Sequence, residues 1–441
     1  MRKSNLAPYS QVVIFGAGMA GVAAAHELAR NRGVRGRIVL VDEREPLSLT
    51  SAKGTEAYRD WWPDPCMARF MARSIDRLEA LAQRTDFGLS RNGYAFFTAD
   101  PLRAVAPQAD AFLTSDRVRA VSLWAESDGI AGADGVRLNA PGPPHARGAD
   151  LVTDRKLLRS LFPWAAEDAC AVLWARRCGW LDAQRLGRAL LAESGAEVVR
   201  DRVIGVDVKG GRVAGVRLAG GGRIGTEALV LAPGPKLKEA GALLGLDLPV
   251  FCELHGKLAF PCRALPPDAP MAIWLDPVRL PWPDAPAHLR GELPGGVHAR
   301  PRGDGELLLI WTYDVQRSEP LFPPRFDPHY GEALVRGLAR MVPGMKQHFG
   351  RAGEGVVDGG YYCKTRENRP LVGPLPVEGA FVIGALSGFG IMGSQAAAEL
   401  LGAHVAGAAL PPDAAEFHPA RYDDPAYVAR LPALEATAGQ L

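Results

Sequence analysis

The stretch VVIFGAGMAGVAAAHELA at residues 12–29 constrains the fold more than any other part of the chain. Its four leading apolar residues, Val12–Phe15, predict a buried parallel strand, and Val22–Arg30 predicts a helix with small residues on the side that faces the sheet. Between them stand three glycines at GxGxxG spacing, Gly16, Gly18 and Gly21. In such a unit the first glycine makes the tight turn, the second lets the backbone approach a pyrophosphate, and the third lets the helix pack closely on the strand.

A second strand and a terminal acid follow at the distance that a dinucleotide site requires. In the segment RIVLVDERE, Arg37–Val41 is the expected strand, and Asp42 stands at its end, where a carboxylate accepts hydrogen bonds from ribose hydroxyls. Because strand, helix, second strand and acid are all present, we interpret residues 10–45 as a βαβ unit that binds a dinucleotide. A glycine-rich turn that binds nothing is the alternative.

A second GxGxxG pattern, from Gly220 to Gly225, is a useful contrast. It lies between the strand-like runs RVAGVRLA and RIGTEALVLAP, no helix follows it, and no acid is correctly placed. The pattern therefore predicts a hairpin turn, and we expect one dinucleotide site rather than two. This disfavours flavoenzymes of the disulfide-reductase type, which carry separate FAD and NAD(P) folds.

Composition narrows the class of protein. The 441 residues are 47% apolar and 23% charged, as in an ordinary globular protein. A net charge of +2 argues against a general nucleic-acid or membrane-surface protein, and no run of about 18 apolar residues predicts a spanning helix. Six cysteines form no CxxC pair and no cluster with zinc-ligand spacing, so we expect reduced, mostly buried thiols, no metal site and a cytoplasmic location.

The remaining sequence alternates between two kinds of pattern. Residues 179–235 predict helix, strand, hairpin and strand, ending in a turn at Ala232–Gly234. Residues 250–345 are rich in proline, tryptophan and strand-like alternation, which predicts an antiparallel sheet with an amphipathic helix at its end. Residues 355–409 return to an α/β pattern of strand, glycine-rich turn and small-residue helix.

Four segments of the chain carry a family resemblance. They are the GAGMAG unit, TSAKGTEAYR, GWLDAQRL…VLAPGP, and YYCKTRENRPLVGP…GALSGFGIMGS. In this order they resemble the D-amino-acid oxidase, sarcosine oxidase and glycine oxidase family of FAD-dependent amine oxidoreductases, over about residues 10–410. The resemblance implies FAD bound in an extended form, with its ring between an FAD domain and a substrate domain.

The fold class that follows is α/β (α+β overall), a Rossmann-like FAD-binding domain interleaved with a mostly antiparallel β-sheet substrate domain. The resemblance divides the chain into an FAD-binding domain (10–100, 160–235 and 355–410), a substrate domain (101–159 and 236–354) and a C-terminal tail (411–441).

The resemblance also implies which residues hold the cofactor. Thr50, Ser51 and Thr55 offer hydroxyl and backbone N–H groups to phosphate or flavin edges. The turn from Gly384 to Gly390 precedes a helix whose N-terminus would face the flavin pyrimidine edge and stabilise negative charge there; a tight connection without a ligand is the alternative. The expected cofactor-binding residues are Gly16, Gly18, Met19, Ala20, Gly21, Asp42, Glu43, Thr50, Ser51, Thr55, Val203, Ala232, Gly234, Gly384, Ser387, Gly388, Phe389, Gly390 and Ile391.

Arg59 falls where enzymes that resemble sarcosine oxidase place an arginine that clamps the substrate carboxylate. A guanidinium fork suits a carboxylate, whereas a surface or ion-paired arginine is the alternative. At the neighbouring position where those enzymes carry another arginine, this chain has Glu56, a charge reversal that leaves both an acidic and a cationic substrate open.

Other departures from the family bear on the chemistry. Covalent members attach flavin through a cysteine at the place of Gly360, whereas Cys363 lies beyond Tyr362, so we expect non-covalent FAD. The strand LLLIWTYD lacks the lysine that often activates oxygen, and Tyr313 stands where those enzymes place a histidine. Met392 occupies the place of a lysine that sometimes follows the glycine-rich turn. The acceptor is therefore O2 or another electron acceptor, and oxidase and dehydrogenase both stay open.

The expected reaction is hydride transfer to flavin N5 from the carbon next to the nitrogen of a small amine or amino acid, giving an imine. A base could take a proton from an ammonium substrate. The candidate catalytic residues are Arg59, His255, Lys257, His298, Tyr313 and Lys364. Structural roles are the alternative: His255 and Lys257 share a strand face and could pair with Glu253, and His298 shares a face with Arg300.

Two other functions stay open at this stage. One is an FAD-dependent hydroxylase or other non-amine oxidation, which would usually need NAD(P)H although no second nucleotide fold is present. The other is an FAD-binding subunit of a heteromeric dehydrogenase. We expect no nucleic-acid and no membrane partner, and the sequence does not reveal the oligomeric state.

Overall fold

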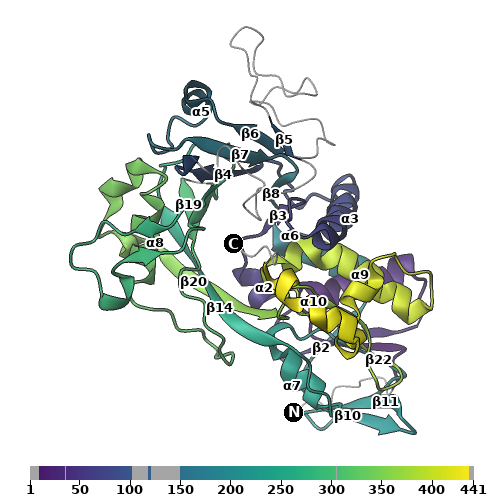
Figure 1. Cartoon of the computed structure of the whole chain (residues 1–441). Coiled ribbons are helices and arrows are strands. Elements are labelled where there is room, and N and C mark those ends of the chain that lie inside the picture. Colours follow the sequence, from purple (N-terminus) through teal and green to yellow (C-terminus); the bar gives the residue numbers. More distant parts are fainter. Residues whose placement is uncertain (1–8, 35, 102–117, 121–148, 304, 437–441) are drawn as a thin grey trace.

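The first strand lies inside a six-stranded sheet of the computed structural model, which describes residues 9–34, 36–101, 118–120, 149–303 and 305–436 (Figure 1). The strand order is β21 (Leu371–Pro374), β22 (Ala380–Gly384), β13 (Ala228–Leu231), β1 (Val12–Phe15), β2 (Ile38–Asp42) and β9 (Glu197–Arg200). Neighbours pair in parallel except β21 and β22. Val13 and Ile14 belong to different core clusters, so the sheet is buried on both faces, as its continuous apolar strands predict.

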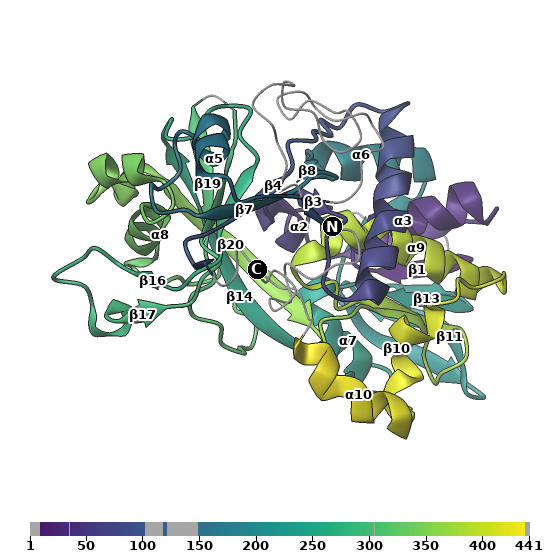
Figure 2. The same ribbon diagram turned by 45° about the horizontal axis from the view of Figure 1, so that its top comes forward.

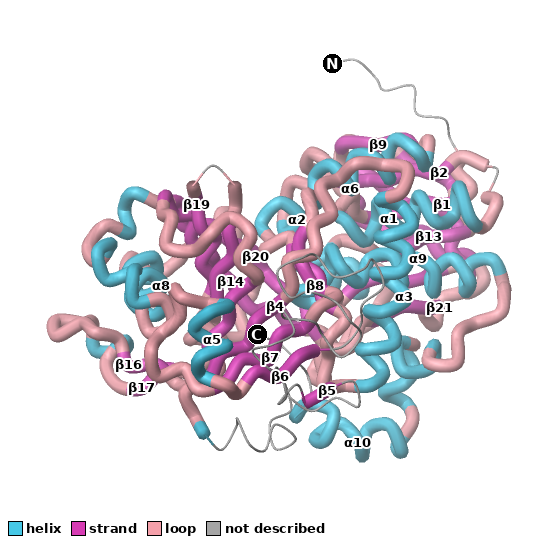
Figure 3. The backbone as a smooth tube through the Cα atoms, turned by 90° about the horizontal axis from the view of Figure 1, so that it is seen from above, coloured by secondary structure: helices cyan, strands magenta, loops and turns pink. Residues whose placement is uncertain are grey.

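Helices cover one face of this sheet, where Figure 3 shows them grouped together. The small-residue helices α1 (Met19–His26), which continues as a π-helical turn over Glu27–Asn31, and α9 (Gly390–Ala406) lie against the strands. Helix α6 (Ala183–Ser194) packs on α1, and α3 (Pro65–Ala82) packs on α9. Alanines and glycines let α1 and α9 approach each other and the strands closely, so the predicted strand–helix–strand unit is present.

A three-stranded antiparallel sheet packs on the other face. It contains β10 (Val203–Lys209), β11 (Arg212–Leu218) and β12 (Arg223–Gly225). Val213 and Val216 of β11 share a core cluster with Val13 and Leu229 of the central sheet. Because β11 and β12 pair antiparallel across residues 219–222, the second GxGxxG pattern is a hairpin, as predicted.

The second large sheet has nine strands and is mostly antiparallel, which confirms the predicted fold class. Two of its pairs are parallel, β15 with β4 and β5 with β6. In order, the strands are β20 (Val356–Lys364), β14 (Phe251–Pro261), β19 (Glu306–Ile310), β18 (His298–Pro301), β15 (Met271–Trp274), β4 (Tyr94–Thr98), β7 (Ala171–Ala175), β6 (Ala149–Val152) and β5 (Val118–Ala120).

Other elements complete the two layers. The α-helices and strands not yet named are α2 (Thr50–Lys53), β3 (Ala57–Arg59), α5 (Arg155–Leu161), β8 (Cys178–Trp180), α7 (Leu237–Ala242), β16 (Val278–Arg279), β17 (Glu292–Leu293), α8 (Tyr330–Leu338) and α10 (Pro425–Ala436). Helix α8 packs on β14 and β19, and Figures 1 and 2 show β14 and β20 side by side on the way from α8 toward α7. All six cysteines are free and buried. In the described ranges no helix is long and apolar enough to cross a bilayer.

Sheet membership differs from the predicted domain ranges at three places. Strands β4, β7 and β20 lie in ranges assigned to the FAD-binding domain, yet they pair within the nine-stranded sheet. The reason is that a short apolar strand carries no signal for which sheet it joins, since its partners are distant in sequence. Most of the predicted substrate range 101–159, namely 102–117 and 121–148, lies outside the described residues.

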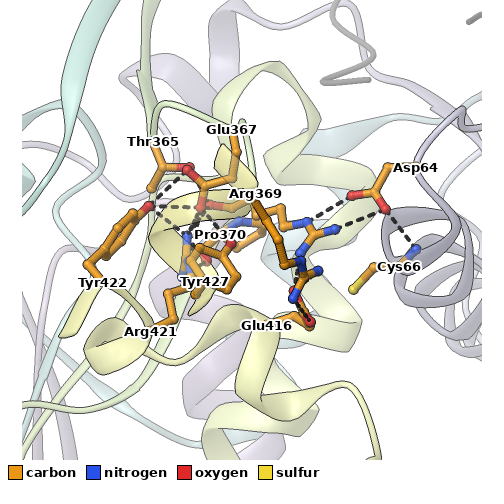
Figure 4. A network of polar contacts seen from close by, with 11 residues as sticks. Asp64, Cys66, Thr365, Glu367, Arg369, Pro370, Glu416, Arg421, Tyr422 and Tyr427 are labelled. Carbon is orange, nitrogen blue, oxygen red and sulfur yellow. Dashed lines mark hydrogen bonds and ion pairs between the residues drawn. The ribbon is translucent and has the colours of Figure 1, made fainter. Parts of the chain in front are cut away.

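A buried ion pair ties the C-terminal tail to the loop between β20 and β21 (Figure 4). Arg421 donates from Nε and Nη2 to Glu367 Oε1 at 3.0 and 2.7 Å, and both side chains are almost completely buried. Tyr422 and Tyr427 donate their hydroxyls to the same oxygen at 2.8 and 3.0 Å. The tail is therefore a clasp on the loop that passes from one large sheet to the other.

The same loop is joined to α3 through Arg369. Its Nε and Nη2 donate to Oδ2 and Oδ1 of Asp64 at 2.8 and 3.1 Å. Asp64 also caps α3, because its Oδ1 accepts from the backbone N–H of Cys66 at 2.9 Å. Glu416 of the tail pairs with Arg369 as well, so the loop is held from both sides.

We predict that Arg421→Met destabilises the protein by about 3–5 kcal/mol, because it leaves the Glu367 carboxylate buried without its cation. Arg366→Met is the matched control: Arg366 pairs with Glu435 at the surface, with 52% of its side chain exposed. The Arg366→Met substitution should lower the free energy of unfolding by less than about 1 kcal/mol. Urea unfolding followed by circular dichroism measures both, and equal losses in the two variants would contradict a special role for the buried pair.

Candidate functional site

The glycine turn after β1 is shaped by close backbone contacts. Gly16 has φ +110°, and a Cβ built there would lie 2.4 Å from the carbonyl oxygen of Ala232. A Cβ on Gly21 would lie 2.0 Å from the carbonyl oxygen of Gly16, so the helix can pack here only without a side chain. A Cβ on Gly18 would meet only Ser51 Oγ, at 3.4 Å. Gly18 therefore faces open space rather than the protein core.

Asp42 closes this turn from the end of β2. Its Oδ2 accepts from the backbone N–H of Ala17 at 2.8 Å, and its Oδ1 accepts from that of Arg44 at 2.9 Å. The predicted ribose-binding acid is thus positioned at the turn by two backbone hydrogen bonds.

A large cavity, here called the main cavity, begins at this turn and runs along the carboxyl ends of β1, β2, β13 and β22. Thirteen of the predicted cofactor-binding residues line it: Gly18, Met19, Ala20, Asp42, Thr50, Ser51, Ala232, Gly234, Gly384, Ser387, Gly388, Gly390 and Ile391. Ligands of open α/β sheets bind at this edge, so the arrangement suits an extended dinucleotide.

The remaining predicted cofactor residues lie around it. Gly16, Glu43 and Val203 line an adjoining space, the Glu43 cavity, which also includes Asp42. There a hydrogen bond from Lys236 lowers the pKa of the Glu43 carboxyl. Thr55 and Phe389 instead line a cavity described below, and Gly21 lines none of these spaces because it packs against Gly16.

The turn before α9 is strained where it borders the main cavity. Ala385 and Ser387 have φ of 51° and 48°, a region that residues with a Cβ seldom adopt. Such strain concentrates at ligand-binding turns. Helix α9 begins at Gly390, so its N-terminal N–H groups and the positive end of its dipole face this cavity.

Helix α2 joins the glycine turn to β20. Ser51 Oγ accepts from the backbone N–H of Met19 at 2.9 Å, and Thr50 donates its hydroxyl to the carbonyl oxygen of Tyr361 at 3.3 Å. Lys53 pairs with Asp358 at 2.8 Å. Tyr361 and Cys363 of β20 also line the main cavity, which the sequence did not indicate because β20 pairs in the other sheet.

A smaller space, here called the Arg59 cavity, adjoins the main cavity. Tyr362 and Gly388 line both. The other lining residues are Thr55, Arg59, Trp62, Tyr94, His255, Met271, His298, Ile310, Thr312, Phe389 and Met392. It brings together three of the six predicted catalytic residues, Arg59, His255 and His298.

Arg59 gives this cavity its charge. It ends β3, it is 4% exposed, and its guanidinium lies 4.3 Å from the ring centroid of Trp62. Burial lowers the pKa of Arg59, yet an arginine stays protonated in proteins. Among the described residues that line the cavity, none is Asp or Glu.

Both histidines of the cavity are held neutral. His298 is buried, its Nδ1 lies 2.7 Å from the carbonyl oxygen of Gly296, and burial lowers its pKa to about 4. Burial also lowers the pKa of His255, against the opposing effect of Glu253. The cavity therefore presents two neutral imidazoles beside one guanidinium.

Two further cations hold the segment that enters the cavity. Lys257 donates to the carbonyl oxygen of Gly54 at 2.8 Å, and Arg300 donates from Nε to that of Thr55 at 3.0 Å. Burial lowers the pKa of Lys257 to about 8 and that of Arg300 to about 10. Neither lines the Arg59 cavity, so the geometry gives Lys257 a structural contact rather than one with a ligand.

Glu56 is turned away from the Arg59 cavity. Its Oε2 lies 3.4 Å from Arg300 Nη2, and its Oε1 accepts from the backbone N–H of Ala183, at the start of α6. The negative charge of Glu56, which left a cationic substrate open in the sequence, is thus paired with Arg300 inside the protein.

Tyr313 and Lys364 lie outside the Arg59 cavity. Tyr313 lines a neighbouring space, here called the Tyr313 cavity, whereas Thr312 lines both. Lys364 is buried and donates to Glu253 Oε2 at 2.8 Å. The sequence missed Thr312 and Tyr362 because it does not reveal which face of an irregular strand end points to a cavity.

We predict that Gly18→Ala keeps the fold but weakens FAD binding by about tenfold or more, because the new methyl occupies the space that a pyrophosphate would need. Gly344→Ala is the control, since nothing lies within 4 Å of its Cβ position and it lines none of these cavities. Titration of apoprotein with FAD, followed by fluorescence, measures both affinities. A Gly18→Ala protein with unchanged affinity would show that the cofactor does not approach this turn.

We also predict that His298 makes the protein acid-sensitive. Its folded-state pKa of about 4 lies below the unfolded value of about 6.5, so stability is unaffected above the higher value and is lost as the pH falls toward the lower one. At about pH 5 the loss amounts to roughly 2 kcal/mol. His298→Asn keeps an N–H donor for Gly296, and its free energy of unfolding in urea should fall correspondingly less between about pH 7.5 and pH 5. Identical decreases in the wild-type and variant proteins would show that His298 is not the source of the acid sensitivity.

Comparison with known sequences agrees with this geometry. The family described as "FAD dependent oxidoreductase" (DAO) matches residues 11–404. A curated relative, the "tRNA 5-methylaminomethyl-2-thiouridine biosynthesis bifunctional protein MnmC" of Paracidovorax citrulli, is 27% identical in an alignment of length 259, which covers 55% of this chain and 38% of that protein. The match thus spans well under half the length of that relative.

Solved structures share the fold across nearly the whole chain. L-proline dehydrogenase from P. horikoshii has a TM-score of 0.73 at 18% identity, covering 95% of this chain and 99% of the other. Glycine oxidase from Geobacillus kaustophilus has a TM-score of 0.70 at 18% identity, and the match covers 93% of this chain and 98% of the other. Iminodiacetate oxidase from Chelativorans sp. BNC1 has a TM-score of 0.66 at 18% identity, and the match covers 93% of this chain and 99% of the other. With its family match from the first strand to α9, this chain belongs to the DAO family and is an FAD-dependent oxidoreductase.

Proposed function

We propose that this enzyme oxidises the C–N bond of a small amino acid or N-substituted amino acid to an imine, which water then hydrolyses. The observation that carries the proposal is the Arg59 cavity: it adjoins the main cavity, it contains a buried guanidinium, and none of its described lining residues is acidic. A carboxylate is the substrate group that such a site would bind.

The main cavity fits the cofactor on the evidence of its own backbone. Gly18 leaves open space where a side chain would protrude, and the first turns of α1 and α9 both present N–H groups to the cavity. The residues that would hold FAD are the thirteen named above, with the Glu43 cavity at the ribose end. When bound, FAD supplies the acceptor for the hydride that leaves the carbon next to the substrate nitrogen.

Arg59 would bind and orient the substrate. Its guanidinium is stacked on Trp62 and enclosed, so a carboxylate would meet it in a site largely shielded from water, where a charge-assisted pair is strong. The cavity encloses about 60 Å³, which leaves room for only a few water molecules and so for a small substrate.

The cavity favours an uncharged amine, because it contains the Arg59 cation and none of its described lining residues is acidic. Burial lowers the pKa of both His255 and His298, so both imidazoles are neutral at neutral pH. A neutral amine keeps the lone pair that drives hydride loss from the neighbouring carbon. The names of the structural neighbours, a proline dehydrogenase, a glycine oxidase and an iminodiacetate oxidase, support an amino acid as the substrate class.

The test is reduction of the enzyme's flavin by substrate under anaerobic conditions, without NAD(P)H. We predict that at least one of glycine, L-proline, iminodiacetate and their N-methyl relatives bleaches the flavin absorbance. Methylamine and pyrrolidine, which lack the carboxylate, are the controls and should not do so at similar concentrations. Arg59→Met should raise the concentration for half-reduction by about tenfold or more, the worth of a charge-assisted hydrogen bond.

Other outcomes would overturn the proposal. Reduction by NAD(P)H alone would indicate a hydroxylase, and equal bleaching by L-proline and pyrrolidine would show that Arg59 binds no carboxylate. Peroxide release under air then distinguishes an oxidase from a dehydrogenase.

A further inference from the structure

Besides Arg59, the Arg59 cavity contains a hydroxyl whose direction is fixed by buried polar side chains. Thr312 and His255 both line the cavity, and Thr312 Oγ1 lies 3.0 Å from His255 Nδ1. The other ring nitrogen, Nε2, lies 3.3 Å from Glu253 Oε2, and this oxygen also accepts from Lys364 Nζ at 2.8 Å. The four side chains form one hydrogen-bonded series that ends at the cavity.

Strand pairing brings these groups together. Glu253 and His255 stand two residues apart on β14, so they share a face. On β20, Tyr362 is the register partner of Glu253, and Lys364 follows on the same face. Tyr362 stacks on the His255 ring with 4.1 Å between centroids and 17° between planes. Stacking and two hydrogen bonds therefore fix the orientation of the imidazole.

Charge decides which ring nitrogen of His255 carries the hydrogen. Burial raises the pKa of Glu253, but hydrogen bonds from His255 and Lys364 outweigh it, and the pKa ends below its usual value. An ionised carboxylate only accepts, so Nε2 of His255 must be the donor. Burial keeps the ring neutral by lowering its pKa, so Nδ1 is an acceptor.

Thr312 must then donate its hydroxyl hydrogen to His255 Nδ1, which is the hydrogen-bond partner that the described structure gives it. With that hydrogen engaged, Thr312 Oγ1 can only accept a hydrogen bond from a molecule in the cavity. An amine N–H is a donor, whereas an ether or carboxylate oxygen is not. The hydroxyl is therefore selective for one end of the substrate.

We infer that Thr312 is a further catalytic residue, which accepts a hydrogen bond from the substrate N–H while Arg59 holds the carboxylate. Glu253, His255 and Lys364 are positioning residues that turn the Thr312 oxygen toward the nitrogen. The inference rests on the proposed function, since it assigns the nitrogen end of the same substrate.

Two acids of nearly equal shape test this. Pyrrole-2-carboxylate has a ring N–H where furan-2-carboxylate has a ring oxygen, and neither is expected to be oxidised. Each is titrated into the FAD-loaded protein and followed by flavin absorbance and by calorimetry. The wild-type protein should bind pyrrole-2-carboxylate more tightly.

Thr312→Val keeps the volume and removes the hydroxyl. It should weaken the binding of pyrrole-2-carboxylate by about three- to tenfold, which corresponds to one hydrogen bond, and leave the binding of furan-2-carboxylate unchanged. Thr312→Ser should keep the wild-type preference. An unaltered flavin spectrum in each variant shows that the site is intact.

The positioning residues have their own test. The double variant Glu253→Met with Lys364→Met removes the buried pair without leaving a lone charge, so it should keep the fold and lose the preference for pyrrole-2-carboxylate. Glu253→Gln combined with Lys364→Met should retain it, because the amide oxygen can accept from His255 Nε2 and no lone charge is left buried. If the double methionine variant binds both acids more weakly to the same degree, Glu253 and Lys364 have a purely structural role, and their assignment as positioning residues is overturned.

The remaining outcomes are decisive as well. If Thr312→Val weakens the binding of both acids equally, Thr312 only shapes the cavity. If it weakens the binding of neither acid, Thr312 does not contact the ligand. Either result overturns the inference while the proposed function stands. A wild-type protein that binds both acids equally would also overturn the inference alone, whereas a wild-type protein whose flavin no amino acid of the panel reduces would refute the proposed function, and the inference with it.

Discussion

The pairing of β14 with β20 is the interaction on which the site depends. Nine consecutive residue pairs join them, from Phe251 with Lys364 to Ala259 with Val356. This ladder places Tyr362 at the boundary between the main cavity and the Arg59 cavity, and it sets His255 against the Tyr362 ring. Gly360 lies in the same ladder and faces α2, since a Cβ built there would lie 3.4 Å from Lys53 Cβ. One antiparallel pair therefore connects the dinucleotide-binding turn, through α2, with the cavity that would receive the substrate.

Buried charge is distributed in a consistent way around this ladder. Lys257 and Arg300 are directed to backbone carbonyl oxygens of the segment at residues 54–55, and Glu56 is directed to Arg300. The Arg59 guanidinium lines the cavity. Cations hydrogen-bonded to backbone oxygens rigidify the wall, whereas a cation that lines a cavity beside neutral imidazoles favours an anionic ligand. The tail clasp pairs the buried charges of Glu367 and Arg421 in the same way, and neither residue lines any of the cavities described above.

Local sequence patterns predicted much of the fold and of the cofactor region. The apolar run at Val12–Phe15, the three glycines and Asp42 each have a short-range physical reason, and the structure places them as a strand, a turn, a close helix contact and a braced acid. The hairpin at Gly220 was equally local. Substrate-side predictions were less complete. Arg59, His255 and His298 meet at one cavity, but Tyr313 lies in the neighbouring space and Thr312 takes its place, because a shift of one residue reverses the face of an extended segment.

The sequence by itself determined the glycine turn and the alternation of α/β and antiparallel segments, since these depend on residues close together in the chain. It also indicated the family, because four such local segments follow one another in the family's order. Only the tertiary structure decided that β4, β7 and β20 join the nine-stranded sheet, that Glu56 answers Arg300, and that Lys364, Glu253, His255 and Thr312 form one series. Lys364 and Glu253 are 111 residues apart in the chain. Contacts between residues so far apart are set by strand pairing and burial, and the local sequence pattern of a strand does not indicate which distant strand it pairs with.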